Sequence, residues 1–565
     1  MPQLSDMPVE LLLHSLFPIL PVSDILHLST SNRFFYQLTS DETFWCVKTR
    51  EDFQYKLSLP LKNMTWKHFY KRLWTQKVFV WGNKQNLGYD EDEPIEPSMR
   101  YVPFPVPVNI PHASIIDLTA GESSFHALDS AGNIHVWGQL SRTSALEGLD
   151  DYGFESAFRR ADRPMRLNLP TAFCGLSCGY AHCVALDISS TVWLFTQWGR
   201  PMRLITPELN CASPDVTPVQ IESGWTFAAV LTSSGDVVVY WPSSHSMRSA
   251  AEVSRRNSHS NRGPIITTET EPNMIPCEVL DINARPVRLP TLPCRCLPDL
   301  TGTGLSEELQ NAPTKLIKIA GLDGALIGLT NKGHVVRYNG LISEYTYQHD
   351  YWEYLPKFSD VREIRDNYTF RTLWAEPPET MHITNISAQR HAFAAWTTSG
   401  RSIVLTGEIV EATTPVIRPA LLDRAVTDVV FGNAHYGVLT APGKLLTWGS
   451  CYDGVLGLGN PMCIPVGKPG GYASIDERLD AIRRGNEGTP PDVIRPAEVM
   501  FYQGRNARDT FCYAVAAAGR HMAALVSDSE VRCNYSCASH LQSTYENILT
   551  ELAIEVPKEE PQALR

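Results

Sequence analysis

Histidine is the side chain whose recurrence in this sequence first suggests chemistry. Five histidines fall in a repeated phrase, each a few residues after a glycine or its substitute: His126, His182, His391, His435 and His521. Imidazole groups bind metals and move protons near neutral pH. Five copies of one phrase cannot share a single metal ion or substrate, however. We therefore predict that each histidine is hydrogen-bonded to neighbouring backbone inside its own repeat, and that none is catalytic or a metal ligand.

The 13 cysteines offer a second possible chemistry, because clustered cysteines bind zinc or form disulfides. Three pairs lie close along the chain, but no Cys-x-x-Cys pair has a matching second pair: Cys174/Cys178, Cys294/Cys296 and Cys533/Cys537. We therefore expect free or buried thiols in a reducing compartment, the cytosol or the nucleus, and no metal site.

Motifs for catalysis and cofactor binding are missing. Gly443-Lys444 lacks both the upstream glycine and the following Ser or Thr of a phosphate-binding loop. There is no Gly-x-Ser-x-Gly motif, no His-Glu-x-x-His motif and no glycine-rich turn for a dinucleotide. A net charge of -12 argues against nucleic-acid binding, and no apolar run has the roughly 18–20 residues of a membrane span. We expect a non-catalytic protein without a cofactor, which binds neither nucleic acid nor membranes.

A repeated strand phrase fills most of residues 76–541. Each copy has alternating apolar residues, a glycine step, an apolar pair, a glycine turn and an aromatic strand such as Val136-Trp137-Gly138. The copies begin at seven places, spanning residues 115–138, 173–196, 219–241, 316–338, 383–407, 429–449 and a last one from 511. One copy cannot bury both faces of its sheet, so copies must stack around an axis. The predicted fold is mainly β, a seven-bladed β-propeller.

The two ends of this array are complementary. The copy from residue 511 has no closing aromatic strand, whereas residues 78–82 (VFVWG) form such a strand without the first half of the phrase. We predict that both combine in one blade, which closes the ring and leaves no free sheet edge.

Three segments interrupt or follow the array. Residues 242–314 are expected to be either a solvated loop or a surface for a substrate or for phosphorylation, and residues 450–510 an insertion with a helix near 474–484. Residues 542–565 are expected to be a tail, first a short helix and then disordered.

Residues 1–75 have a different pattern. Asp6 and Pro8 suit the start of a helix, and apolar residues then recur at helical spacing, including Leu12, Leu16 and Leu20. Four short helices in about 45 residues cannot bury so many large apolar side chains, so part of the surface should face a partner. We place a small all-α module at residues 1–50 and a helical linker at 51–75.

The N-terminal module resembles the F-box. The parts of that motif stand here as Met7-Pro8, Glu10-Leu11-Leu12, Asp24-Ile25-Leu26, Leu28-Ser29, Phe34-Phe35 and Asp41 through Trp45, with Met7 in place of the family's leucine. The family's F-box docks on the Skp adaptor, which joins a cullin and a RING subunit. The resemblance thus implies Skp contacts from Met7, Pro8, Leu11, Leu12, Leu16, Leu20, Ile25, Leu26, Leu28 and Trp45.

The array resembles the regulator-of-chromosome-condensation repeat, a seven-bladed propeller whose hallmarks are a Gly-x-x-His step and a terminal Trp-Gly. An F-box followed by this propeller is similar to the F-box proteins grouped with the fungal SCF-associated factor. That resemblance implies the substrate-recognition subunit of an SCF ubiquitin ligase, which binds a target while its partners transfer ubiquitin. Two alternatives stay open: a guanine-nucleotide exchange factor for a small GTPase, as the propeller family's founding member is, and an F-box scaffold outside the ligase.

Substrate contacts are expected on loops, because Trp, Gly and His occupy the blade interiors. The insertion at residues 150–169 carries Arg159, Arg160 and Arg163. Arginine forks onto carboxylate or phosphate groups, so these three are the predicted contacts for an acidic or phosphorylated substrate. Arg255 and Arg256 lie in the longer insertion and are the weaker candidates.

Overall fold

The computed structural model describes fifteen stretches of the chain, which are residues 4–53, 65–88, 100–111, 113–140, 160–209, 213–259, 273–283, 285–293, 297–347, 351–373, 376–398, 402–409, 414–485, 490–502 and 510–528. Internal contacts divide the chain into a helical unit, Met1–Thr75 with Asp528–Arg565, and a larger unit, Gln76–Ser527. Arg159 and the predicted tail at 542–565 lie outside the described residues.

The helical unit consists of short helices packed around aromatic side chains. They are η1 (Leu4–Asp6), α1 (Val9–Leu11), η2 (Leu12–Leu16), η3 (Phe17–Ile19), α2 (Val22–Ser31), α3 (Arg33–Leu38), α4 (Glu42–Phe53) and α5 (Trp66–Trp74). Asp41 caps α4, with its Oδ1 accepting from the backbone N–H of Phe44 at 3.0 Å. The Trp45 ring centroid lies 4.9 Å from that of Tyr70. Helix α5 therefore completes the core of this unit and is more than a linker.

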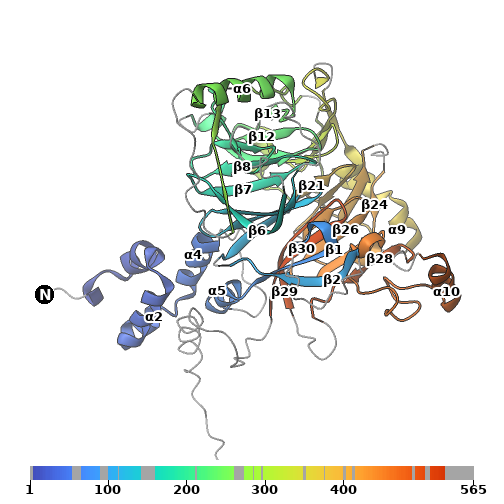
Figure 1. The fold of residues 1–565 in the computed structure, drawn as a ribbon, viewed down its shortest axis with the longest axis horizontal. Helices are drawn as coiled ribbons and strands as arrows, with labels where there is room; N and C mark the ends of the chain where they lie inside the picture. Colours follow the sequence, from blue (N-terminus) through green and yellow to red (C-terminus); the bar gives the residue numbers. More distant parts are fainter. Residues whose placement is uncertain are drawn as a thin grey trace, which may run out of the picture. The chain divides into compact units, whose positions relative to one another are not determined.

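The larger unit holds seven sheets of four or five strands, which we call blades one to seven (Figure 1). Blade one has β3 (Ile115–Ala120), β4 (Ser124–Asp129), β5 (Ile134–Gln139), β6 (Arg160–Asn168) and β14 (Met274–Pro276). Blade two has β7 (Phe173–Cys178), β8 (Cys183–Asp187), β9 (Val192–Phe195), β10 (Met202–Leu204) and β15 (Leu280–Ile282). Blade three has β11 (Pro218–Ser223), β12 (Ala228–Thr232), β13 (Val237–Tyr240) and β16 (Val287–Arg288).

The remaining blades have four strands each. Blade four has β17 (Leu316–Gly321), β18 (Leu326–Thr330), β19 (Val335–Tyr338) and β20 (Trp352–Tyr354), and blade five has β21 (Asn385–Gln389), β22 (Ala392–Trp396), β23 (Val404–Glu408) and β24 (Val416–Ile417). Blade six has β25 (Val426–Phe431), β26 (His435–Thr440), β27 (Leu445–Gly449) and β28 (Val493–Glu498). Blade seven has β29 (Thr510–Ala518), β30 (His521–Asp528), β1 (Lys77–Asn83) and β2 (Tyr101–Val108).

The blades form a closed ring. The first strand of each blade packs against the first strand of the next, in the order β3, β7, β11, β17, β21, β25, β29 and again β3. All seven predicted copies of the phrase are blades, and the predicted seven-bladed β-propeller is confirmed. Trp81, Trp137 and Trp448 from the aromatic strands are 0%, 0% and 1% exposed. Burial of an aromatic side chain stabilises a fold by about 2–3 kcal/mol, which explains why tryptophan recurs there.

Blade seven joins the two ends of the array, as predicted. Strand β1 pairs antiparallel with β30, from Lys77 opposite Val526 to Gly82 opposite His521. Figure 1 shows this as a blue strand beside a red one. The Nε1–H of Trp81 also donates to the carbonyl of Val455 at 2.8 Å, which ties blade seven to the end of blade six. The split blade is therefore confirmed.

Two insertions have more structure than the sequence indicated. Residues 242–314 include α6 (His245–His259), α7 (Glu307–Asn311) and three strands. Strand β14 pairs parallel with β6, β15 pairs parallel with β10, and β16 pairs antiparallel with β13. Ile275 and Ile282 are fully buried there. The expectation of a solvated loop or a substrate surface is therefore wrong for these residues. The sequence did not indicate the strands, because strands of two or three residues are too short to show a period. Likewise, residues 160–168 are strand β6 and not a loop.

Three further helices connect strands, namely α8 (Val361–Arg365), α9 (Tyr368–Leu373) and α10 (Ile475–Arg484). Helix α10 confirms the helix predicted in the 450–510 insertion, and the hydroxyl of Ser474 caps it by accepting from the Glu477 N–H at 3.1 Å. The return of that insertion is strand β28, the outer strand of blade six. Across the described stretches, no helix combines the length and apolarity needed to cross a membrane.

Candidate functional site

The candidate site is built from the inner turns, which join the first and second strand of each blade. Strand register makes these turns comparable: His435 opposes Gly449 in blade six, His521 opposes Gly82 in blade seven and Ser124 opposes Gly138 in blade one. The residue two positions earlier is different in every blade. From blade one to blade seven it is Glu122, Tyr180, Trp225, Asp323, Arg390, Asn433 and Gly519.

Backbone hydrogen bonds link neighbouring inner turns. Four backbone N–H groups each donate to a carbonyl of the next blade over 2.6–3.2 Å. The donor and acceptor residues are Tyr180 and Trp225, Trp225 and Leu322, Asp323 and Arg390, and Asn433 and Gly519. Each bond joins one blade to the next. The backbones of the turns in blades two to five, and of those in blades six and seven, are therefore fixed relative to one another.

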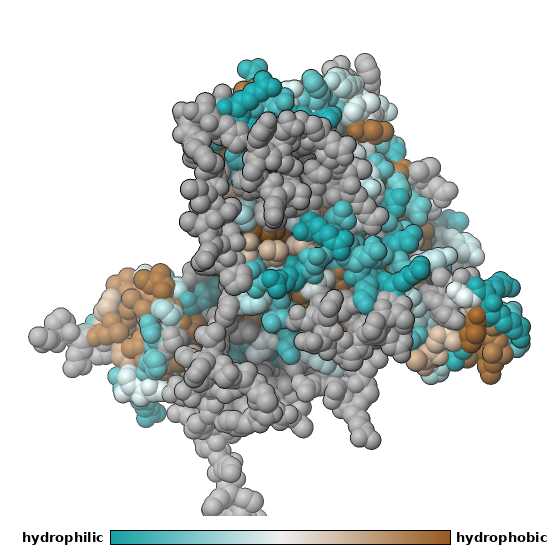
Figure 2. Space-filling view, in the orientation of Figure 1, coloured by the Kyte–Doolittle hydropathy of each residue, from teal (hydrophilic) through white to brown (hydrophobic). Residues whose placement is uncertain are grey.

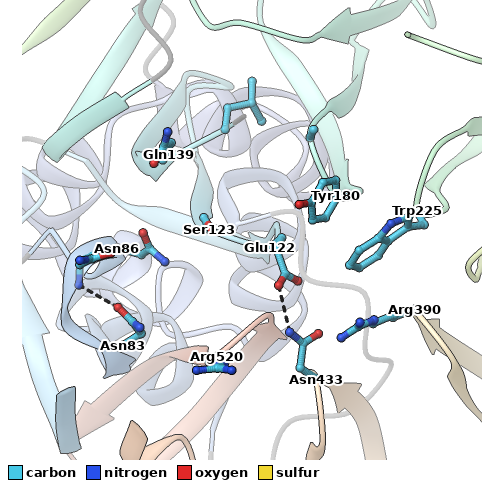
Figure 3. Close-up of a pocket in the computed structure, with 13 residues that line it drawn as sticks. Asn83, Asn86, Glu122, Ser123, Gln139, Tyr180, Trp225, Arg390, Asn433 and Arg520 are labelled. Carbon is cyan, nitrogen blue, oxygen red and sulfur yellow. Dashed lines mark hydrogen bonds between the residues drawn. The ribbon is translucent and has the colours of Figure 1, made fainter. Parts of the chain in front are cut away.

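The inner turns of every blade except blade four line a pocket of about 610 Å³, within the range of roughly 300–1,000 Å³ typical of ligand sites (Figure 3). Besides the inner turns, its wall includes the end of β1 with η4 (Lys84–Asn86) and the end of β5. Carboxamides are frequent in the wall: Asn83, Gln85, Asn86, Gln139 and Asn433. An amide both donates and accepts hydrogen bonds, so this wall can pair with the backbone of a peptide.

An aromatic pair with a guanidinium beside it forms another part of the wall. The rings of Tyr180 and Trp225 are stacked, with centroids 4.4 Å apart and planes at 26°. The guanidinium carbon of Arg390 lies 5.0 Å from the Trp225 ring centroid, at cation–π distance. Figure 3 shows these three on the side of the pocket opposite Asn83 and Asn86.

Three charged side chains line the pocket, and two of them have partners within the protein. Glu122 Oε1 accepts from Asn433 Nδ2 at 2.9 Å, and Arg520 forms an ion pair with Asp453 at 3.3 Å. Arg390 has no acidic partner among the described residues, and its buried Nε has no hydrogen-bond acceptor there. Among the described lining residues there is no histidine or cysteine.

The strand register corrects the prediction about the histidines. Only His182, His435 and His521 occupy one equivalent place, at the start of the second strand. His126 lies two residues beyond Ser124, which fills that place in blade one, and the exposed His391 lies one residue before it in blade five. A histidine a few residues after a glycine therefore did not identify equivalent residues.

The hydrogen bonds of these histidines also differ from the prediction. His182 Nε2 lies 3.1 Å from the carbonyl of Phe227, and His521 Nε2 lies 3.0 Å from that of Gly121, each in the next blade. The histidines thus join blades rather than brace their own repeat. Burial lowers the pKa of His182 and His521 to about 4 and that of His435 to about 3, so all three are neutral at pH 7.

A buried cluster between blades one and two has the composition of a metal site. The ligand atoms of His126, Cys178 and Cys183 all lie within 4.8 Å of one another. The Trp198 Nε1–H, which can only donate, points at His126 Nε2 over 3.2 Å, and His126 Nδ1 lies 3.1 Å from Cys178 Sγ. Burial lowers the pKa of His126 to about 3. The neutral ring therefore has both nitrogens hydrogen-bonded, and the cluster is a satisfied core network.

The ten residues predicted to contact Skp divide by exposure. Leu12, Ile25, Leu26 and Trp45 are buried in the core of the helical unit. Met7, Pro8 and Leu11 are exposed, and Leu16, Leu20 and Leu28 are partly exposed. Further exposed apolar residues join them on these helices: Leu4, Val9, Ile19 and Tyr36. Figure 2 shows this apolar surface around α2.

Of the predicted substrate arginines, the two that the structure describes, Arg160 and Arg163, do not line the pocket. Arg160 and Arg163 are exposed on β6, and Arg160 Nε contacts Asp162 Oδ1 at 2.6 Å. Sequence reasoning favoured them because they stood in a presumed loop. The pocket residues were not predicted, because the prediction used the positions that stay constant between repeats. The pocket is lined instead by residues of the inner turns that vary between repeats.

Comparisons with known proteins add the following. No protein-family model matches the sequence, and no curated protein matches it. Similar solved structures include human WBSCR16, with 16% identity over 81% of this chain and 100% of that one, at a TM-score of 0.45. Yeast RCC1 (Prp20) bound to Kap60 has 13% identity over 81% of this chain and 90% of that one, at a TM-score of 0.46. Because these scores are below 0.5, the strand pairing carries the assignment of the propeller.

Proposed function

We propose that this chain is the non-catalytic substrate-recognition subunit of an SCF-type ubiquitin ligase. In this proposal the helical unit binds a Skp adaptor, and through it a cullin and a RING subunit. The propeller binds a protein target, which the partners ubiquitinate for proteasomal degradation. The site of action would be the cytosol or the nucleus.

The observation that carries the proposal is the exposed apolar surface of the helical unit. The unit already has a core, in which Phe17, Phe44 and Phe69 are fully buried. Even so, Leu11 is 48% exposed and Ile19 is 77% exposed. Apolar side chains left outside a complete core are typical of a surface that binds a partner. The order of F-box-like motifs in residues 4–50 supports an adaptor as that partner.

Burial assigns different roles to the ten predicted Skp residues. Leu12, Ile25, Leu26 and Trp45 would hold the helices in place, and Trp45 is anchored by its Nε1–H donating to the Thr39 carbonyl at 2.8 Å. The exposed Met7, Pro8 and Leu11 would make direct contacts. Substitution of Leu12 would therefore test the fold of the unit more than it tests binding.

The test is co-purification of Skp and cullin with a surface variant. Leu11→Asp with Ile19→Asp places two charges on the apolar surface and should abolish co-purification, since burying an unpaired carboxylate is costly. Ile494→Asp is the matched control, because Ile494 is also 77% exposed but lies on β28 of the propeller. Wild-type co-purification by the double variant would refute the adaptor role. Nucleotide exchange on a small GTPase by the purified chain would support the exchange-factor alternative instead.

A further inference from the structure

We propose that the propeller pocket binds an acidic segment of a protein, with Arg390 as the group that binds its anionic side chain. The inference rests on the proposed function, in which the propeller captures a target, and it assigns the chemistry of that target. A carboxylate of Asp or Glu and a phosphorylated side chain share this chemistry.

The backbone of Arg390 is the first observation. Arg390 has φ 51°, in the left-handed region that residues with a Cβ rarely adopt. The corresponding residue of blade seven is a glycine, Gly519, with φ 47°. The arginine thus occupies a conformation for which glycine is the ordinary choice. Such residues gather at functional sites, where a side chain is needed despite the strain.

The surroundings of the Arg390 side chain are the second observation. Its backbone carbonyl accepts from the Asp323 N–H at 2.6 Å, which fixes the turn. Its guanidinium lies against Trp225, which is itself stacked on Tyr180. The described residues supply no carboxylate to it and no acceptor to its buried Nε. The planar guanidinium of Arg390 is therefore oriented in the pocket and still has hydrogen-bond donors to offer. This suits an anion with two acceptor oxygens, such as a carboxylate or a phosphate.

The other charges in the pocket leave that capacity available. Glu122 is the one carboxylate among the described lining residues, and Asn433 donates to it. Arg520 adds a second guanidinium, which Asp453 partly neutralises. The net charge of the whole chain, -12, disfavours a nucleic acid as the anion, because its phosphates would be repelled beyond the pocket. A short acidic stretch of polypeptide fits both the local cation and the amide-rich opposite wall.

The experiment selects peptides from a random dodecapeptide display library with the purified full-length chain. We expect the selected peptides to share an Asp or Glu at one position. Changing that residue to Asn or Gln should weaken binding at least tenfold, and phosphoserine in its place should preserve binding if phosphate is also accepted. Arg390→Gln should weaken binding of the acidic peptide to the same extent, and combining this variant with the changed peptide should cause no further loss of affinity.

Two variants separate recognition from folding. Arg390→Lys keeps the charge and should retain part of the affinity. Arg424→Gln removes an exposed arginine outside the pocket and should bind like the wild type. Selected peptides without an acidic position, no selected peptide at all, or wild-type affinity of Arg390→Gln would each overturn the inference. If Skp binding stays intact in that case, the ligase role survives and only the ligand class is refuted.

Discussion

Blades five and seven use the same short inner turn for different purposes. In each, two residues join the first and second strands, and the first of them has a left-handed φ: Arg390 at 51° and Gly519 at 47°. A Cβ on Gly519 would overlap the carbonyl oxygen of Glu122 in blade one, where the ring closes. Arg390 instead extends its side chain over Trp225. The backbone geometry is therefore shared, but blade one leaves no room for a side chain at Gly519, whereas Arg390 carries one that reaches the pocket.

The residue that begins the second strand shows the same division. In blade seven it is His521, which is fully buried and bonded to the Gly121 carbonyl of blade one. In blade five it is Ala392, which makes no side-chain hydrogen bond. We conclude that the first residue of the second strand helps to close the ring in blade seven through its side chain, whereas in blade five it does not.

The largest expected effect is that of Gly519→Ala. The new Cβ meets backbone of Glu122, which cannot move aside without opening the contact between blades seven and one. We expect a loss of about 2–4 kcal/mol in the free energy of unfolding, measured by urea denaturation. Gly467→Ala is the control, since Gly467 has φ 79° but open space around its Cβ position, and it should cost about 1 kcal/mol. Equal losses would show that the packing at Gly519 is unimportant.

A pH effect on stability is expected from blade seven. Burial lowers the pKa of His521 from 6.5 to about 4, so the unfolded chain binds more protons between these values. The free energy of unfolding should thus be highest above pH 6.5 and fall as the pH decreases towards 4. His521→Gln should reduce this slope. Identical slopes for wild type and His521→Gln would contradict the role assigned to burial.

The smallest expected change in stability is that of Arg390→Gly. Glycine relieves the left-handed strain but increases the entropy of the unfolded chain and loses the contact with Trp225. These effects oppose one another, and the free energy of unfolding should stay within about 1 kcal/mol of the wild type. Thermal and urea denaturation measure it. A loss as large as that of Gly519→Ala would mean that Arg390 is also needed for closure.

The sequence alone predicted the fold well and the pocket not at all. Strands ending in Trp81, Trp137 and Trp448 repeat strongly because each fills the space between blades, so blade number and the split blade followed from them. Strands β14 and β15 have three residues each, too few to show a period. They pair with β6 and β10, which lie far away along the chain, so their own sequence does not reveal the pairing. The pocket depends on the residues that vary between copies, and repetition cannot identify those.

The central claim is that an inner turn recognises a ligand while the constant positions hold the ring. The most direct measurement uses an acidic peptide that was selected on the wild-type chain. The affinity of this peptide for the Arg390→Gly variant is determined by fluorescence anisotropy, and the unfolding free energy of the variant is measured alongside. We predict a loss of affinity of at least tenfold with stability unchanged within about 1 kcal/mol. Unchanged affinity, or a loss that appears only together with unfolding, would contradict the claim.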